Sequence, residues 1–224
     1  MFLQGFFISP IDFLYNVLYN KYVLNKYAGG LMMNNYEYLS HIKKIIIHES
    51  EIQDKLQEAG KYINSLYTGK PLIFVSILKG SFIFMADLIR NVSVPCQISF
   101  MQAKSYYEST QSSGIVKITM DLDKDITDCD VVIIEDIIDT GRTLKDVVKL
   151  LEARKPNSLH VVTLLDKPDR RIVDMKSDFS LFTISDLFVV GYGLDYNEYY
   201  RELPFIAEYT EEVVEDDIDE EISK

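Results

Sequence analysis

The stretch that decides the fold is VVIIEDIIDTGRTL, which runs from Val131 to Leu144. Its first residues are β-branched and apolar, which is typical of a strand buried on both faces of a parallel sheet. Two carboxylates, Glu135 and Asp136, follow at the carboxyl end of this strand, and the chain then turns into a helix. Because ligands of open α/β sheets bind at that edge, the stretch predicts both a fold class and the position of a site.

The turn after the strand carries the features of a phosphate site. Asp139 precedes Thr140, Gly141, Arg142 and Thr143, where the glycine permits a positive φ and the threonines offer hydroxyls. The next helix begins there with unpaired backbone N–H groups, which together form a nest for a phosphate monoester. A strand, an acidic turn and a helix cap also occur together without any ligand, so this stretch alone leaves both interpretations open.

The three carboxylates of this stretch add a further condition. They would repel a phosphate unless another charge offsets theirs, and a divalent metal does so. Mg²⁺ binds through few carboxylates plus substrate oxygens, and carboxylates also accept hydrogen bonds from sugar hydroxyls. A phosphorylated sugar with a metal-bound diphosphate therefore satisfies every group. The chain has neither a Walker-type P-loop motif nor GxGxxG after a strand, which disfavours kinase and dinucleotide sites.

Strands and helices alternate on both sides of this stretch. Apolar residues at helical spacing predict a helix over residues 50–66, with Ser50 and Gln53 as a capping box. The other expected helices are residues 81–92, with apolar positions Phe82, Met85, Leu88 and Ile89, and residues 143–154. The expected strands are residues 71–80, 96–106, 131–135, 159–167 and 187–196. This order predicts an α/β fold with a mostly parallel central sheet flanked by helices.

Length and composition limit the class of protein. With 224 residues the chain has room for one main domain, and its formal charge of −12 disfavours a nucleic-acid partner. Cys96 and Cys129 lack the spacing of a zinc site or a disulfide framework, which indicates a reducing, cytoplasmic setting. The apolar residues 1–19 lack a basic n-region and contain polar interruptions. We therefore expect no membrane span, with a membrane-skimming segment as the alternative.

Three regions follow from these patterns. Residues 1–32 are expected to be an N-terminal extension, because Met32 and Met33 directly precede the first stretch with domain-like patterning. Residues 33–207 are expected to form the domain. The acidic residues 208–224 are expected to be a solvated tail, since like charges repel one another.

Four motifs, in order along the chain, resemble those of the type I phosphoribosyltransferases. The stretch from Val131 to Leu144 is similar to the loop that binds 5-phosphoribosyl diphosphate (PRPP) in that family. The others are Leu78-Lys79-Gly80, Lys104-Ser105-Tyr106 and the run FVVGYGLDYNEYYR from Phe188 to Arg201. Over residues 34 to about 207 the chain resembles the bacterial-type hypoxanthine-guanine phosphoribosyltransferases, which implies the type I fold with a small hood region.

The resemblance implies a reaction and a set of roles for the PRPP half of the site. The reaction is the Mg²⁺-dependent transfer of phosphoribosyl from PRPP to N9 of hypoxanthine or guanine, giving IMP or GMP plus pyrophosphate. Asp139 would be the general base or acid for the proton on purine N7. Glu135 and Asp136 would hold the ribose hydroxyls and Mg²⁺, and Thr140 to Thr143 would hold the 5′-phosphate, with Arg142 using its backbone N–H. The implied pyrophosphate ligands are the backbone N–H groups of Lys79 and Gly80, together with Arg201.

The resemblance also implies the purine half of the site. Lys167 would meet the 6-position of the purine, and because an ammonium is only a donor, it favours a 6-oxo group over the 6-amino group of adenine. Phe188 would stack on the ring, and Val189 would read its edge through backbone groups. Asp195 would bind a second Mg²⁺, with its carbonyl near the 2-position of the base. Discrimination against xanthine stays open.

Three further expectations complete the sequence analysis. The polar loop from Lys104 to Lys117 would close over the site as a lid, with Ser105 and Tyr106 covering the diphosphate. By resemblance the Leu78–Lys79 peptide is expected to be cis, and the protein to be a homodimer or homotetramer. The alternative from another functional class is a regulatory relative that senses nucleotides and binds RNA or DNA, which the acidic charge disfavours.

Overall fold

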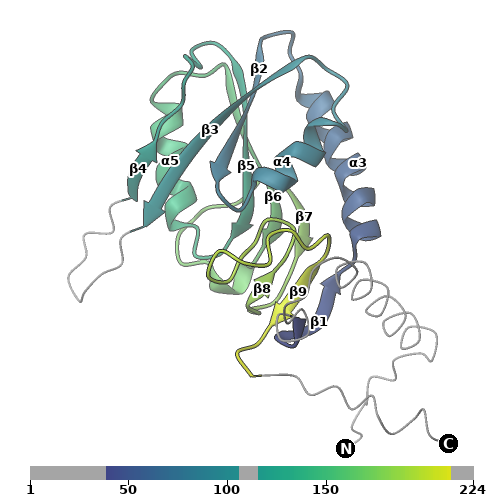
Figure 1. Cartoon of the computed structure of the whole chain (residues 1–224). Helices are drawn as coiled ribbons and strands as arrows, with labels where there is room; N and C mark the ends of the chain where they lie inside the picture. Colours follow the sequence, from purple (N-terminus) through teal and green to yellow (C-terminus); the bar gives the residue numbers. More distant parts are fainter. Residues whose placement is uncertain (1–38, 106–115, 213–224) are drawn as a thin grey trace, which may run out of the picture. The chain divides into compact units, whose positions relative to one another are not determined.

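The computed structural model describes residues 39–105 and 116–212 of the chain (Figure 1). The chain divides into two units, of which the larger is Lys44–Tyr209 and the smaller combines Met1–Lys43 with Thr210–Lys224. In the smaller unit the backbone N–H of Thr210 donates to the carbonyl of His41 at 2.9 Å. The expected extension and residues 213–224 of the expected tail lie outside the described residues.

A six-stranded sheet lies at the centre of the larger unit, with the strand order β4-β3-β2-β5-β6-β7 (Figure 1). Its strands are β2 (Leu72–Leu78), β3 (Cys96–Ser105), β4 (Val116–Met120), β5 (Asp130–Ile138), β6 (Ser158–Asp166) and β7 (Phe179–Thr183). Neighbouring strands are parallel except β3 and β4, which are antiparallel. The predicted α/β class with a mostly parallel sheet is confirmed, and the carboxyl ends of β2, β5 and β6 meet at one edge.

Helices cover both faces of the sheet. The helices α3 (Glu49–Leu66) and α4 (Phe82–Ile89) lie on one face, and α5 (Arg142–Glu152) lies on the other (Figure 1). Side chains along β5 alternate between these two cores, with Val132 and Ile134 in the first and Val131 and Ile133 in the second. This double burial is the reason that the strand is continuously apolar in sequence.

A smaller, three-stranded sheet has the order β1-β9-β8, with β1 (Ile42–Ile47), β8 (Val189–Val190) and β9 (Ile206–Tyr209). The prediction of a last strand over residues 187–196 in the parallel sheet is wrong. Only two residues of that run are in β8, which is antiparallel to β9. The chain turns directly afterwards because Gly191, Tyr192 and Gly193 all have positive φ, at 99°, 50° and 102°.

Several boundaries also differ from the sequence analysis. The helix α3 begins at Glu49, and its capping interaction is between His48 and Glu51, whose carboxylate accepts the His48 backbone N–H at 2.8 Å. Phe82, predicted on the apolar face of α4, is 42% exposed as the first residue of that helix. Glu208 is buried in β9, so the last strand extends two residues beyond the expected domain end.

Four strands were not predicted, namely β1, β4, β7 and β9. They are short and contain polar residues, and the alternation of exposed and half-buried positions in β4 gives no continuous apolar run. Since Lys104 and Ser105 end β3 and pair with Lys117 and Val116 of β4, the expected loop 104–117 is shorter than predicted. Tyr106 and the rest of this loop lie outside the described residues.

Candidate active site

A cavity of about 250 Å³ opens at the carboxyl ends of β2 and β5. Two motifs that are distant in sequence line it together, the loop after β2 and the stretch that links β5 to α5. The predicted site residues that line this cavity are Lys79, Gly80, Glu135, Asp136, Asp139, Thr140, Gly141 and Thr143. Arg142 does not line it, because its side chain is exposed at the first position of α5.

The carboxylates of Glu135 and Asp136 are enclosed at this edge. The strand β5 runs on to Ile138, so both residues lie within the strand rather than beyond its end. Burial and the neighbouring charge of Asp136 raise the pKa of Glu135 well above its ordinary value. Burial also raises the pKa of Asp136 to about 6, against the opposing effect of the Ile137 backbone N–H, which donates to its Oδ1 at 2.9 Å. For both acids, the effect of burial on the pKa exceeds that of the groups that stabilise the charged form.

The same two side chains fit a cation or sugar hydroxyls. Oε2 of Glu135 is buried and has no hydrogen-bond partner among the described residues, which is costly unless a ligand supplies one. Carboxylate oxygens are the ligands that Mg²⁺ prefers. However, the described residues contain no group of three or more His, Cys, Asp or Glu side chains arranged to hold a metal ion. Mg²⁺ usually binds through one or two carboxylates together with substrate oxygens and water.

Glycines allow the loop after β2 to approach these acids. A Cβ atom at Gly80 would lie 1.5 Å from Oδ2 of Asp136, so any side chain there would displace this carboxylate. A Cβ atom at Gly193 would lie 2.1 Å from the carbonyl oxygen of Gly80, so the motif near the C-terminus also contacts this loop. The Leu78–Lys79 peptide is cis, as the resemblance implied.

Gly141 has the conformation that the turn chemistry predicted. Its φ is 81° in the left-handed region, and it is the N-cap residue of α5, whose first N–H groups face the turn. The segment after β6 covers this glycine closely, because an added Cβ atom would lie 3.0 to 3.2 Å from side-chain atoms of Arg171, Met175 and Val173. The helix N-terminus is thus held against the residues that follow β6.

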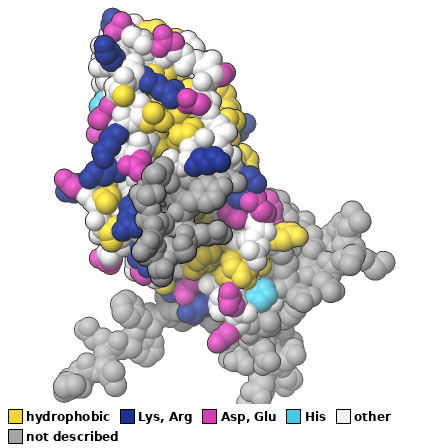
Figure 2. Space-filling model, turned by 90° about the vertical axis from the view of Figure 1, so that its left-hand side faces the viewer, with side chains coloured by type: hydrophobic (Ala, Val, Ile, Leu, Met, Phe, Trp, Pro, Cys, Tyr) yellow, Lys and Arg dark blue, Asp and Glu magenta, His cyan; other side chains and the backbone are white. Residues whose placement is uncertain are grey.

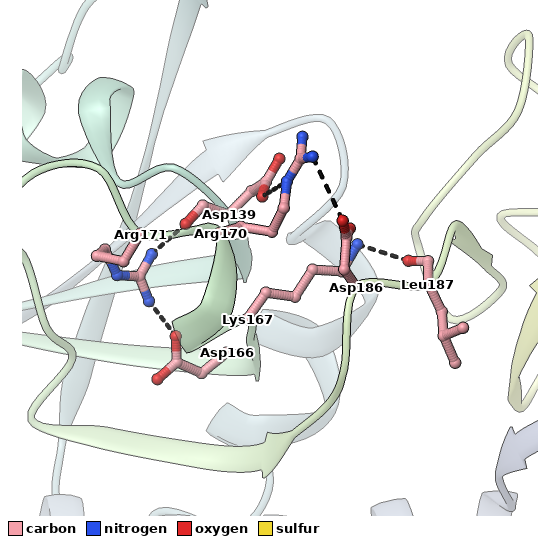
Figure 3. A network of polar contacts seen from close by, with 7 residues as sticks. All are labelled: Asp139, Asp166, Lys167, Arg170, Arg171, Asp186 and Leu187. Carbon is pink, nitrogen blue, oxygen red and sulfur yellow. Dashed lines mark hydrogen bonds and ion pairs between the residues drawn. The ribbon is translucent and has the colours of Figure 1, made fainter.

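Three basic and three acidic residues form a polar network that includes Asp139 (Figure 3). Nε of Arg170 donates to Oδ1 of Asp139 at 3.0 Å, and Nη1 donates to Oδ2 of Asp186 at 3.4 Å. The guanidinium of Arg171 donates to the backbone carbonyl of Asp139 and to the carboxylate of Asp166.

Lys167 belongs to the same network. It follows β6 directly and is 8% exposed, and its Nζ donates to the carbonyl of Leu187 at 2.6 Å (Figure 3). Burial lowers its pKa, and the charges of Asp139 and Asp186 oppose that effect. Sequence reasoning found Lys167 but missed Arg170 and Arg171. The available signal was the run Lys167–Arg171, KPDRR, which places three cations directly after a strand in an acidic chain.

The predicted pyrophosphate ligand Arg201 binds acidic neighbours. Its Nη2 is 2.8 Å from Oδ1 of Asp195 and 3.3 Å from Oε2 of Glu198, and its Nη1 donates to the carbonyl of Gly193 at 2.7 Å. Oε2 of Glu198 also accepts from Nζ of Lys79 at 2.8 Å. Glu198, which the sequence analysis did not single out, therefore binds the ammonium of Lys79 as well as the predicted pyrophosphate ligand Arg201. Asp195 and Arg201 also act on the pKa of Asp136, in opposite directions.

The predicted purine-stacking residue has a free surface. Phe188 is 55% exposed, and its ring meets Tyr196 and Tyr209 edge-on at centroid distances of 5.9 and 5.8 Å. These two tyrosines stack on one another at 4.3 Å. Val189 is buried in β8, directly after Phe188.

On the face shown in Figure 2, Lys and Arg side chains of the described residues are interspersed with Asp and Glu. Among the described residues, every helix is too short or too polar to span a bilayer.

Comparison with known proteins agrees with this geometry. A family model of the phosphoribosyl transferase domain matches residues 45–197. The hypoxanthine-guanine phosphoribosyltransferase of Staphylococcus aureus (strain Mu50 / ATCC 700699) is 48% identical over 172 residues, covering 77% of this chain and 96% of that protein.

Solved structures give the same result. A crystal structure of a hypoxanthine phosphoribosyltransferase from Staphylococcus aureus matches with a TM-score of 0.75 and 46% identity, covering 80% of this chain and 97% of the other. A hypoxanthine-guanine phosphoribosyltransferase from Bacillus anthracis matches with a TM-score of 0.72 and 43% identity, covering 75% and 99%. The resemblance drawn from four sequence motifs is confirmed, and the chain belongs to the hypoxanthine-guanine phosphoribosyltransferases of the phosphoribosyltransferase family.

Proposed function

We propose that this protein is a purine-salvage enzyme that transfers the 5-phosphoribosyl group of PRPP to N9 of hypoxanthine or guanine. The products are IMP or GMP and pyrophosphate. The observation that carries the proposal is the pair of enclosed carboxylates, Glu135 and Asp136, in a cavity shared with the glycine turn at the start of α5. Two enclosed carboxylates destabilise the unliganded protein. A ribose 5′-phosphate can bind both parts of the cavity, with its two hydroxyls at the carboxylates and its phosphate at the glycine turn.

The PRPP half of the site would use donors and acceptors in separate places. Glu135 and Asp136 would accept hydrogen bonds from the ribose hydroxyls. The 5′-phosphate would bind the hydroxyls of Thr140 and Thr143 and the backbone N–H groups around Gly141. At the other end, Lys79, Gly80 and Arg201 would bind the pyrophosphate, with Arg201 exchanging its present carboxylate partners for phosphate oxygens.

In the purine half, the base would lie between the ring of Phe188 and the carboxylate of Asp139. Lys167 would donate to the 6-oxo group, and the backbone of Val189 and Asp195 would contact the opposite edge of the ring. As N9 attacks C1′, the bond from C1′ to the pyrophosphate oxygen breaks and its electron pair leaves with pyrophosphate. Asp139 would accept the proton from N7 in this direction and return it in the reverse reaction.

Mg²⁺ would complete the site together with PRPP. Glu135, Asp136 and Asp195 are the side chains that would hold it, directly or through water. Bound there, it would offset the negative charge of the diphosphate. Ser105 and Tyr106 would cover the diphosphate as part of the lid.

One assay tests the proposal. Purified protein is incubated with PRPP and Mg²⁺, and pyrophosphate release is measured with hypoxanthine, guanine, xanthine and adenine side by side. We expect release with the first two bases, its loss in EDTA, and a fall of about 10²-fold or more in the Asp139→Asn variant. Absence of release with all four bases would refute the proposal, and release with xanthine would extend the range of acceptors.

Three coarser features belong to the same proposal. We expect residues 33–207 to form the catalytic domain, and we expect a cytoplasmic enzyme, in keeping with the free thiols of Cys96 and Cys129. We also expect a homodimer or homotetramer. Light scattering on the purified protein tests the oligomeric state, and a monomer that turns over at the full rate would contradict it.

A further inference from the structure

Arg170 joins the two halves of the site through its side chain, and the roles above leave it unused. It ends the short helix η1 (Pro168–Arg170), directly after Lys167. Its Nε donates to Oδ1 of Asp139 at 3.0 Å, and its Nη1 donates to Oδ2 of Asp186 at 3.4 Å (Figure 3). One guanidinium therefore binds an acid after β5 and another acid before β8.

The contact with Asp139 uses only one carboxylate oxygen. Within the described residues no donor is bonded to Oδ2, while the backbone carbonyl of Asp139 accepts from Arg171. Asp139 is thus held at its main chain and at Oδ1 by two consecutive arginines. A carboxylate held in this way keeps Oδ2 in a fixed direction, which a general base requires before its substrate arrives.

The contact of Arg170 with Asp186 links the Asp139 carboxylate to the segment that precedes the predicted purine-stacking residue, Phe188. Asp186 directly precedes Leu187, whose carbonyl accepts from Lys167, and Phe188 comes next in sequence. Arg170 therefore links Asp139 to the segment that carries the predicted purine-stacking residue. The planar fork of arginine allows both contacts at once, whereas an ammonium has no such fixed geometry.

We propose that Arg170 is a positioning residue for the reaction, which orients the Asp139 carboxylate so that Oδ2 faces N7 of the purine. The inference rests on the proposed function, since it assigns Arg170 a role through the base of that reaction. Arg170 and Asp139 are both nearly half exposed, at 47% and 42% of their side chains, so their ion pair contributes little to folding. Its effect is expected in turnover rather than in stability.

The test compares Arg170→Met and Arg170→Lys with the wild type under saturating PRPP and Mg²⁺. The methionine keeps an unbranched stem but no donor, and kcat with hypoxanthine is expected to fall about tenfold. The KM for PRPP is expected to change by less than about twofold, because PRPP contacts are left in place. Lysine keeps the charge near Asp139 but loses the fork, so its kcat is expected to lie between those of Arg170→Met and the wild type.

A matched control is Arg154→Met, which removes another surface arginine that binds a carboxylate, here both oxygens of Asp121 at 2.8 Å. It is expected to leave kcat unchanged. Asp139→Asn alone and together with Arg170→Met completes a double-mutant cycle. If Arg170 acts through Asp139, the double variant has the same kcat as Asp139→Asn.

Two results would overturn the inference. One is an Arg170→Met variant with at least half of the wild-type kcat, and the other is a double variant whose losses multiply. A wild-type protein without activity on any purine would instead refute the proposed function, so the two failures are distinguishable.

Discussion

Gly80 lies against the carboxylate of Asp136, so closely that a Cβ atom on the glycine would be 1.5 Å from Oδ2 and 2.5 Å from Cγ of the acid. Gly80 lies in the loop directly after β2 and Asp136 lies in the neighbouring strand β5, and the two residues meet at the carboxyl edge of the sheet. The predicted pyrophosphate loop and the predicted ribose acid are therefore in direct contact. The first prediction tests this contact.

Gly80→Ala is expected to displace the Asp136 side chain and to lower kcat/KM by about 10²-fold, since displacements near 1 Å have such effects. Steady-state kinetics with PRPP and hypoxanthine measure the loss. Gly69→Ala is the matched control, because φ at Gly69 is 91° but an added Cβ would contact nothing within 4 Å. That variant is expected to lose some stability and retain its activity, and equal kinetic losses in both variants would contradict the prediction.

Asp136→Asn is expected to stabilise the unliganded protein at neutral pH. The pKa of Asp136 is raised from 3.8 to about 6, so the folded protein holds this proton more tightly than the unfolded chain. The free energy of unfolding therefore falls as the pH rises from about 4 to about 6, by up to about 3 kcal/mol from this group. Asparagine stays neutral and can still accept a hydrogen bond from the Ile137 N–H, so the variant avoids this fall in the free energy of unfolding.

Urea unfolding at pH 4 and pH 7.5 checks this prediction. The free energy of unfolding of the variant is expected to exceed that of the wild type at pH 7.5 and to be closer to it at pH 4. PRPP with Mg²⁺ should raise the urea midpoint of the wild type only. Asp54→Asn, at an exposed position of α3, serves as the control without a stability change. A variant less stable than the wild type at pH 7.5 would show that ionised Asp136 does not destabilise the folded protein.

Glu198→Gln is expected to tighten the binding of pyrophosphate. One oxygen of Glu198 accepts from Lys79 at 2.8 Å and from Arg201 at 3.3 Å, so this carboxylate competes with an anionic ligand for both cations. Removing its charge is expected to lower the inhibition constant of pyrophosphate severalfold, an effect that added salt weakens. Glu58→Gln, which loses a 2.6 Å contact with Lys55 on α3, should leave that constant unchanged. Weaker pyrophosphate inhibition in Glu198→Gln would mean that the carboxylate holds Lys79 and Arg201 in place for pyrophosphate rather than competing with it.

Lys167→Gln is expected to relax the preference for 6-oxopurines. The ammonium is a donor only, whereas the glutamine amide can accept from the 6-amino group of adenine. The ratio of kcat/KM for hypoxanthine over adenine is expected to fall by about 10-fold or more. Lys176→Gln, an exposed position, is the control and should keep the wild-type ratio. An unchanged ratio in Lys167→Gln would place the discrimination elsewhere, for example in the backbone around Val189.

Much of the fold was predictable because its signals are local. The doubly buried strands β2, β5 and β6 are continuous apolar runs, and α5 shows its apolar face at helical spacing. The strands β1, β4 and β7 gave no such signal, since they are short and partly polar. Their pairing depends on neighbours that are distant in sequence.

The sequence by itself determined the family, the order of the central elements and the residues of the turn from Asp139 to Thr143, because each motif is contiguous. Only the tertiary structure decided how charges meet across the chain. It brings Glu198 to Lys79 and Arg170 to Asp139, separations of 119 and 31 residues, and among the described residues it leaves the buried Oε2 of Glu135 without a hydrogen-bond partner. Such contacts follow from the parallel order of strands, which gathers distant loops at one edge, and burial there raises the pKa of Glu135 and of Asp136.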